Sequence, residues 1–135
     1  MMLAVDTSVV IAAFATWHDG HRAALAALDR RPLLPAHALL ESYSVLTRMP
    51  PPHRVLPATA TAFLEARFAE PLLGLSPVEH RRLLETAAKG GVAGGSIYDA
   101  LIAWTAKRAG ATLLTRDRRA VRVYEAVGVR FELVA

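Results

Sequence analysis

The chain has 135 residues, a formal net charge of +4 at pH 7 and no cysteine. The lack of cysteine excludes disulfide frameworks and thiolate-bound metal sites. This length suits one hydrophobic core, so we expect a single domain over residues 1–135. Hydrophobic residues make up 53% of the chain, which is rich for a free monomer and predicts an apolar patch covered by a second copy or another partner.

The basic residues are almost all arginine, since Lys89 and Lys107 are the only lysines. Guanidinium groups bind phosphate oxygens in a bidentate way, so this basic surface suits a nucleic acid. A biased base composition of the genome would also give many arginines and few lysines, so it is the alternative explanation. The apolar stretch from Val9 to Ala15 is too short to span a bilayer, and no positive charge precedes it. We therefore expect a soluble cytoplasmic protein with no membrane association.

Strands and helices are expected to alternate along the chain, with proline and glycine at their ends. The expected strands are 2–5, 33–34, 72–75, 111–115 and 129–134. The expected helices are 7–15, 20–30, 36–48, 57–68, 77–89, 97–109 and 118–127. This alternation favours parallel pairing through right-handed crossovers. The sequence therefore predicts an α/β fold, a three-layer α/β/α sandwich with a central parallel sheet of about five strands.

Three aspartates fall where ligands bind in such a fold, outside the carboxyl ends of the strands. Asp6 follows the first strand, Asp117 follows the strand that ends at Thr115, and Asp99 lies in the first turn of a helix entered through a glycine loop. Each has a structural alternative as a helix cap, and Ser96 with Asp99 has the spacing of a capping box.

Glu41 is the fourth candidate. It shares a helical stripe with Ala38, Val45 and Met49, so its carboxylate is expected to be buried and to meet either a metal or a nearby arginine. Four converging carboxylates repel one another unless a divalent cation holds them. Oxygen ligands without cysteine select hard cations, which predicts Mg²⁺ or Mn²⁺.

Four segments, in this order, resemble the PIN-domain ribonucleases and, among them, the VapC-type toxins of toxin–antitoxin pairs. They are "VDTSVV", "ALLESYSVLTRMP", "GGSIYDALIAWTA" and "LLTRDRRA". The resemblance covers essentially the whole chain. It implies a PIN fold, an acidic metal-binding quartet of Asp6, Glu41, Asp99 and Asp117, and two supporting hydroxyls, Ser8 and Thr115.

The resemblance also implies a function. The expected activity is Mg²⁺- or Mn²⁺-dependent endonucleolytic hydrolysis of RNA, with Asp99 or Asp117 orienting the attacking water. The expected partners are a VapB-type antitoxin protein and a second copy of the chain in a homodimer.

Four arginines surround the last acid: Arg116, Arg118, Arg119 and Arg122. We interpret them as phosphate contacts for RNA, with a solvated helix face as the alternative. The glycine-rich stretch "GGVAGGS" is no P-loop, because no G-K-[ST] follows it. His18 and His21 have no third ligand near them in sequence and are expected in surface or packing positions.

Two other functions compete with the nuclease. A receiver-like signalling module also binds Mg²⁺ with acids at a parallel sheet edge, but it needs a lysine after its last strands, and both lysines precede "ATLLT". A catalytically inactive binding subunit would be expected to lack part of the acidic set, whereas all four acids are present.

Overall fold

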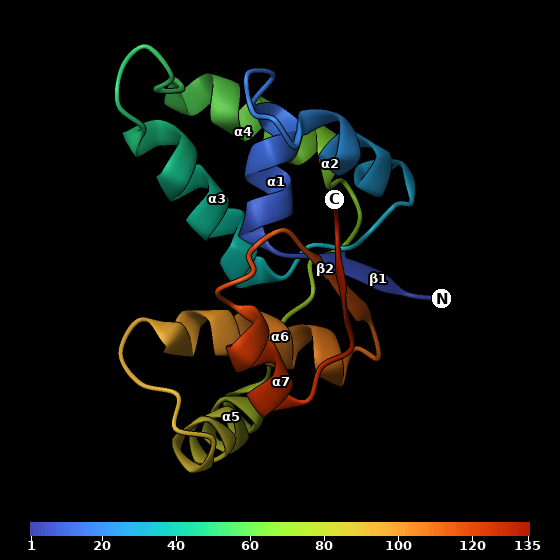
Figure 1. The fold of residues 1–135 in the computed structure, drawn as a ribbon, viewed down its shortest axis with the longest axis vertical. Helices are drawn as coiled ribbons and strands as arrows, with labels where there is room; N and C mark the ends of the chain where they lie inside the picture. Colours follow the sequence, from blue (N-terminus) through green and yellow to red (C-terminus); the bar gives the residue numbers. More distant parts are fainter.

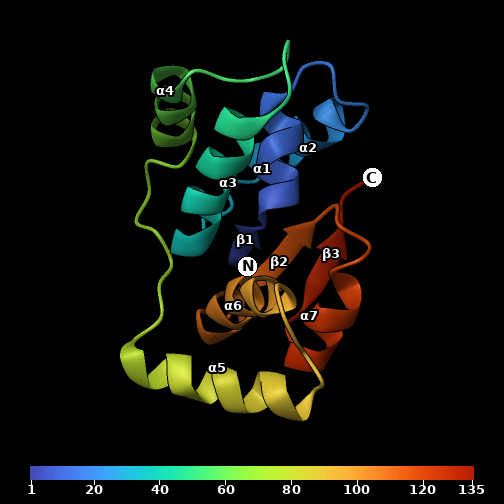
Figure 2. The same cartoon turned by 90° about the vertical axis from the view of Figure 1, so that its left-hand side faces the viewer.

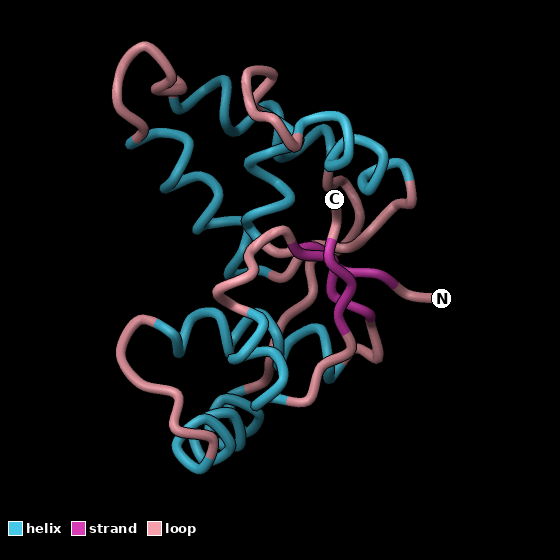
Figure 3. Tube along the Cα trace, in the orientation of Figure 1, coloured by secondary structure: helices cyan, strands magenta, loops and turns pink.

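The computed structural model describes residues 1–135 and contains three strands and seven helices. The strands are β1 (Leu3–Val5), β2 (Thr112–Thr115) and β3 (Phe131–Leu133). The helices are α1 (Thr7–Phe14), α2 (His21–Asp29), α3 (Ala36–Arg48), α4 (Pro57–Arg67), α5 (Pro77–Lys89), α6 (Ser96–Arg108) and α7 (Val121–Val127). The strands pair in parallel in the order β1–β2–β3 and lie between an upper and a lower group of helices (Figure 3).

Two further segments extend this sheet by single bridges. Leu33 bridges Ala4, and Pro35 bridges Leu73, both in parallel. These bridges fall in the two segments expected as the second and third strands, so the expected five strands are three strands and two bridges. The physical reason lies partly in Pro35, because proline has no N–H to continue a ladder.

The sheet lies between two layers of helices, which confirms the α/β/α arrangement. Helices α1 to α4 lie on one side, and α5, α6 and α7 lie on the other (Figures 1 and 2). Ala4, Val5, Leu113 and Leu114 are fully buried, as expected for parallel strands covered on both faces, whose sequences are continuous apolar runs.

The last helix begins later than expected. The sequence predicts a helix from Arg118, whereas α7 starts at Val121. Asp117 causes the difference: its side-chain oxygen accepts a hydrogen bond from Arg119 N at 3.0 Å, and its carbonyl accepts one from Ala120 N at 3.1 Å. These bonds close a turn in place of the first helical turn.

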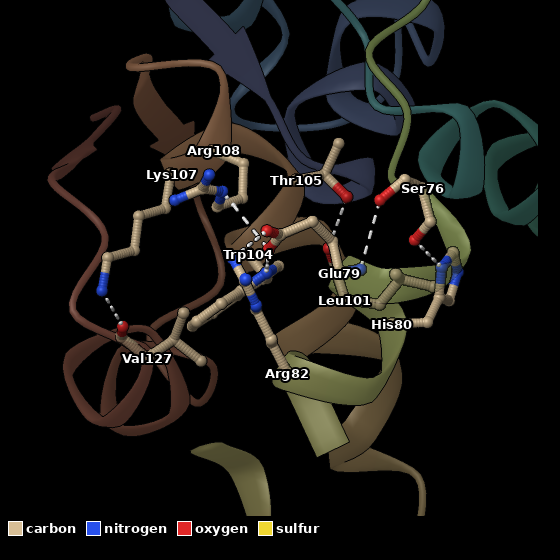
Figure 4. Close-up of polar contacts among 10 residues, drawn as sticks. All are labelled: Ser76, Glu79, His80, Arg82, Leu101, Trp104, Thr105, Lys107, Arg108 and Val127. Carbon is tan, nitrogen blue, oxygen red and sulfur yellow. Dashed lines mark hydrogen bonds and ion pairs between the residues drawn. The ribbon is translucent and has the colours of Figure 1, made fainter. Parts of the chain in front are cut away.

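A polar network fastens α5 to α6, the helix that carries Asp99 (Figure 4). Trp104 Nε1 donates to Glu79 Oε2 at 2.8 Å, and the guanidinium groups of Arg82 and Arg108 lie 3.0 and 3.3 Å from the same carboxylate. The Trp104 hydrogen bond and the two arginines lower the pKa of Glu79. The ionised Glu79 therefore helps to fix the position of α6 against α5.

Candidate active site

Asp6 is the most deeply buried acid of the chain, with 3% of its surface exposed. It directly follows β1 and caps α1, because its Oδ1 accepts hydrogen bonds from Ser8 N and Val9 N at 3.0 and 3.4 Å. Its Oδ2 accepts a hydrogen bond from Tyr124 Oη at 2.6 Å. Burial raises the pKa of Asp6, and these side-chain and backbone hydrogen bonds oppose the rise. Asp6 therefore both caps α1 and occupies its expected position in the acidic site.

Glu41 lies across from Asp6 on α3 and is only partly buried, with 32% of its side chain exposed. The sequence predicted full burial of this carboxylate, whereas the structure buries it only in part. Its Oε1 accepts a hydrogen bond from Thr7 Oγ1 at 2.5 Å, and its Oε2 lies 3.7 Å from His37 Nε2. No arginine forms an ion pair with Glu41, so the structure does not support the alternative that Glu41 forms a salt bridge with an arginine.

Asp99 differs from the other three acids because its carboxylate has no hydrogen bond or ion pair to the protein. The alternative of a capping box with Ser96 is not what the structure contains, since the cap position of α6 is Gly95 and no side chain caps this helix. Burial, followed by the nearby carboxylates of Asp117, Glu41 and Asp6, raises the pKa of Asp99 to about 6. Asp99 therefore lies in a concentration of negative charge and has no cationic partner in direct contact.

Two hydroxyls join the ends of β1 and β2. Ser8 Oγ donates to Asp6 Oδ1 at 2.5 Å and accepts from Arg116 N at 2.8 Å. Thr115 Oγ1 lies 3.5 Å from Ser8 Oγ and accepts from Asp117 N at 3.0 Å. This chain of contacts holds the first and last acids in register at one edge of the sheet.

All four acids line one small cavity of about 40 Å³, together with Thr7, Ser8, Ile102 and Tyr124. A wider cleft of about 520 Å³ opens above it and shares Glu41, Asp99 and Asp117. The charge of this edge and the all-oxygen donor set suit a hard divalent cation. As the side chains lie, no three acidic or imidazole groups are close enough to share an ion. Asp99 is the one acid of the four whose carboxylate has no bond to the protein, so its side chain is the freest to rotate toward the other three.

The four arginines expected to bind RNA lie in different surroundings. Arg119 lines the cleft and lies 3.5 Å from Asp117 Oδ1. Arg118, in the turn, and Arg122, on α7, are exposed and do not line the cleft; Arg122 instead lines a separate cavity beside Gly90 and Gly91. Arg116 also lines the cleft, but its guanidinium bonds the carbonyls of Val134 and Ala135. The expected shared helix face of Arg118, Arg119 and Arg122 is wrong, because the first two precede α7.

The sequence reasoning gave no role in the site to four residues that contribute to it: Thr7, Tyr124, Arg48 and His18, the last of which was expected only in a surface or packing position. Thr7 and Tyr124 hold Glu41 and Asp6, and His18 and Arg48 line the cleft. Tyr124 has the spacing of a core residue on α7, and its contact with Asp6 spans 118 residues. The sequence signal that pointed to Thr7 was its place in "VDTSVV", directly after Asp6.

Curated proteins with similar sequences carry a common name. The chain is 53% identical over 133 residues to ribonuclease VapC40 of Mycobacterium tuberculosis, which covers 98% of this chain and 99% of that protein. It is 44% identical over 134 residues to ribonuclease VapC27 of the same species, with coverage of 98% and 97%.

Solved structures share the fold at lower identity. FitAcB from Neisseria gonorrhoeae aligns with a TM-score of 0.71 at 19% identity over 96% of each chain. VapBC2 from Rickettsia felis, bound to a DNA fragment from its promoter, aligns with a TM-score of 0.67 at 17% identity over 98% of each chain. The PIN domain family matches residues 3–126. This match rules out the alternative of a receiver-like signalling module. The chain therefore belongs to the PIN domain family and is of the VapC type.

Proposed function

We propose that this protein is an Mg²⁺- or Mn²⁺-dependent endoribonuclease, built as one PIN domain over the whole chain. The observation that carries the proposal is the set of four carboxylates around one cavity beneath an open cleft. The 53% identity to a protein named as a ribonuclease supports RNA as the substrate. Nothing in the cleft favours a binding subunit without catalysis, since no acid of the quartet is replaced.

Asp6, Glu41, Asp99 and Asp117 would hold the cation. A bound Mg²⁺ or Mn²⁺ supplies an acidified water and neutralises charge on the phosphate in the transition state. Asp99 is the best placed to orient the attacking water, because its carboxylate lines the cleft and has no bond to another protein group, so it is free to accept a hydrogen bond from that water. Ser8 and Thr115 position the acids through their hydroxyls.

Phosphate contacts fall to the cationic side chains of the cleft. Arg119 is the strongest candidate, because its guanidinium lies beside Asp117 and faces the same opening. Arg118 and Arg122 would add charge to the approach of the strand, since both are exposed. Arg116 contributes through a guanidinium that the C-terminal residues hold in place.

The biological role follows the relatives. We propose a toxin that a VapB-type antitoxin protein neutralises, supported by the VapC names and by the VapBC2 neighbour. A homodimer is supported by large apolar side chains left exposed on α3 and α6, where Leu40, Tyr43 and Tyr98 are 68%, 37% and 53% exposed. We place the activity in the cytoplasm, where RNA is found. No helix is long and apolar enough to cross a bilayer.

Incubation of the purified protein, freed of antitoxin, with total cellular RNA tests the proposal. We expect discrete fragments in Mg²⁺ or Mn²⁺ and intact RNA in EDTA. Asp6→Asn should abolish cleavage and keep the fold, because asparagine has nearly the same shape at this buried position. Asp29→Asn is the matched control, since Asp29 is exposed at the end of α2. Retained cleavage in Asp6→Asn or in EDTA would refute the proposal.

A further inference from the structure

An aromatic pair lies exposed at the end of the molecule where α1 and α3 both finish. Trp17, in the loop after α1, packs on His53, in the loop after α3, with ring centroids 4.1 Å apart and planes at 31°. Trp17 remains 53% exposed, so one face of the indole is covered and much of the rest is open to solvent. We name Trp17 and His53 the aromatic platform; its two loops lie at the same end in Figures 1 and 2.

The platform is continuous with the acidic cleft. His18 lines the cleft and directly follows Trp17, with their rings 6.0 Å apart. Arg48 also lines the cleft and ends α3, the helix that leads into the loop of His53. The cleft therefore runs from the carboxylates along α1 and α3 toward the platform.

The distance between acids and platform suits a short length of nucleic acid strand. Helix α1 joins Asp6 to the loop of Trp17 and has eight residues, which is about 12 Å of rise. A strand advances about 3.4 Å per nucleotide when stacked and more when extended, so about four stacked nucleotides, or fewer extended ones, span this distance. Arg48 and Arg116 both line the cleft, so a phosphate backbone that follows the cleft would meet cationic side chains.

Both loops of the platform are braced. His18 Nδ1 accepts a hydrogen bond from Gly20 N at 2.9 Å, and Gly20 packs so closely on the Arg116 guanidinium that a Cβ would lie 2.1 Å from its central carbon. In the other loop, Arg54 Nε donates to Met49 O at 2.9 Å and His53 N donates to Pro50 O at 3.0 Å. A braced aromatic surface loses little entropy when a planar ligand stacks on it.

We propose that the aromatic platform binds an unpaired nucleobase of the RNA strand whose phosphodiester lies at the carboxylates. This inference rests on the proposed ribonuclease function and adds a substrate subsite to it. Base stacking on an exposed aromatic face tolerates any base, because every base has a π face. The platform therefore selects single-stranded RNA and fixes the position of the cut relative to one stacked base, without reading its identity.

The test measures binding of a short single-stranded RNA, labelled with a dye, by fluorescence anisotropy in EDTA, so that the strand is not cut. A series of strands carries one abasic nucleotide at each position in turn. With the wild-type protein, one position should weaken binding by about 5- to 10-fold, the low end of stacking on an aromatic side chain, because His53 already covers one face of Trp17. In Trp17→Leu that positional penalty should vanish, and in Trp17→Phe part of it should return.

Leu84→Ala is the control, because Leu84 is 63% exposed on α5, in the opposite helical layer. It should keep the wild-type profile. An affinity and abasic profile of Trp17→Leu equal to the wild type would overturn the platform and leave Trp17 to a protein contact. Cleavage of the same RNA in Mn²⁺ is measured in parallel. Wild-type cleavage with an unchanged Trp17→Leu profile refutes the platform alone, whereas neither binding nor cleavage by the wild type refutes both proposals.

Discussion

Replacing Tyr124 with phenylalanine removes one oxygen and leaves the ring in place, so this variant isolates the hydrogen bond to Asp6. The bond is 2.6 Å long, and the two residues are 1% and 3% exposed. A hydrogen bond to a charged group contributes about 1.5–3 kcal/mol, and water cannot easily reach the abandoned oxygen. We expect the free energy of unfolding to fall by about 2 kcal/mol, or about 6–10 °C in Tm for a chain of this size.

Urea denaturation at pH 7 in EDTA measures the loss. Tyr43→Phe is the control, since Tyr43 is 37% exposed and its hydroxyl has no hydrogen bond, and its stability should stay within about 0.5 kcal/mol of the wild type. The pKa of Asp6 should rise further in Tyr124→Phe, because the tyrosine hydrogen bond lowers it. Equal stabilities of Tyr124→Phe and Tyr43→Phe would refute the structural role of this bond.

Two predictions concern pH. The pKa of Asp99 is raised to about 6, so its contribution to stability is present at low pH and is lost as pH rises through 6. In urea unfolding without divalent cations, wild-type stability should therefore fall relative to Asp99→Asn over this range, and parallel profiles would contradict the prediction. The pKa of Glu79 is lowered by Trp104, Arg108 and Arg82, so its contribution is present at neutral pH and lost as pH falls below about 4.5. Glu79→Gln should therefore have a lower urea midpoint than the wild type at pH 7 and approach it in acid, whereas a constant difference would refute the role of the charge.

The meeting of Asp6 and Asp117 at one edge of the sheet could be predicted, because it depends on the order of the strands along the chain. Asp6 and Asp117 follow neighbouring parallel strands, and the carboxyl ends of such strands must share an edge. The helix limits at 36–48 and 77–89 agree with the structure, because prolines mark where these helices begin or end.

Other features of the site and fold could not be predicted, because they depend on tertiary packing or on a competing local hydrogen bond. The hydroxyl of Tyr124 meets Asp6 only after α7 has packed, and no local pattern distinguishes it from a core aromatic residue. The stripe of Glu41 suggested full burial, but the open cleft above it leaves the side chain 32% exposed. The side-chain turn of Asp117 displaced the start of α7 because a local hydrogen bond competes with the first helical turn.

Binding of Mn²⁺, measured by electron paramagnetic resonance, tests most directly whether the four carboxylates form one cation site. The wild-type protein should bind the ion, and Asp6→Asn and Asp99→Asn should each weaken binding by about 10–100-fold or more, because each removes a ligand charge. Asp29→Asn, an exposed aspartate on α2, should bind as the wild type does. Equal Mn²⁺ affinity in the wild type, Asp6→Asn and Asp99→Asn would contradict the shared site.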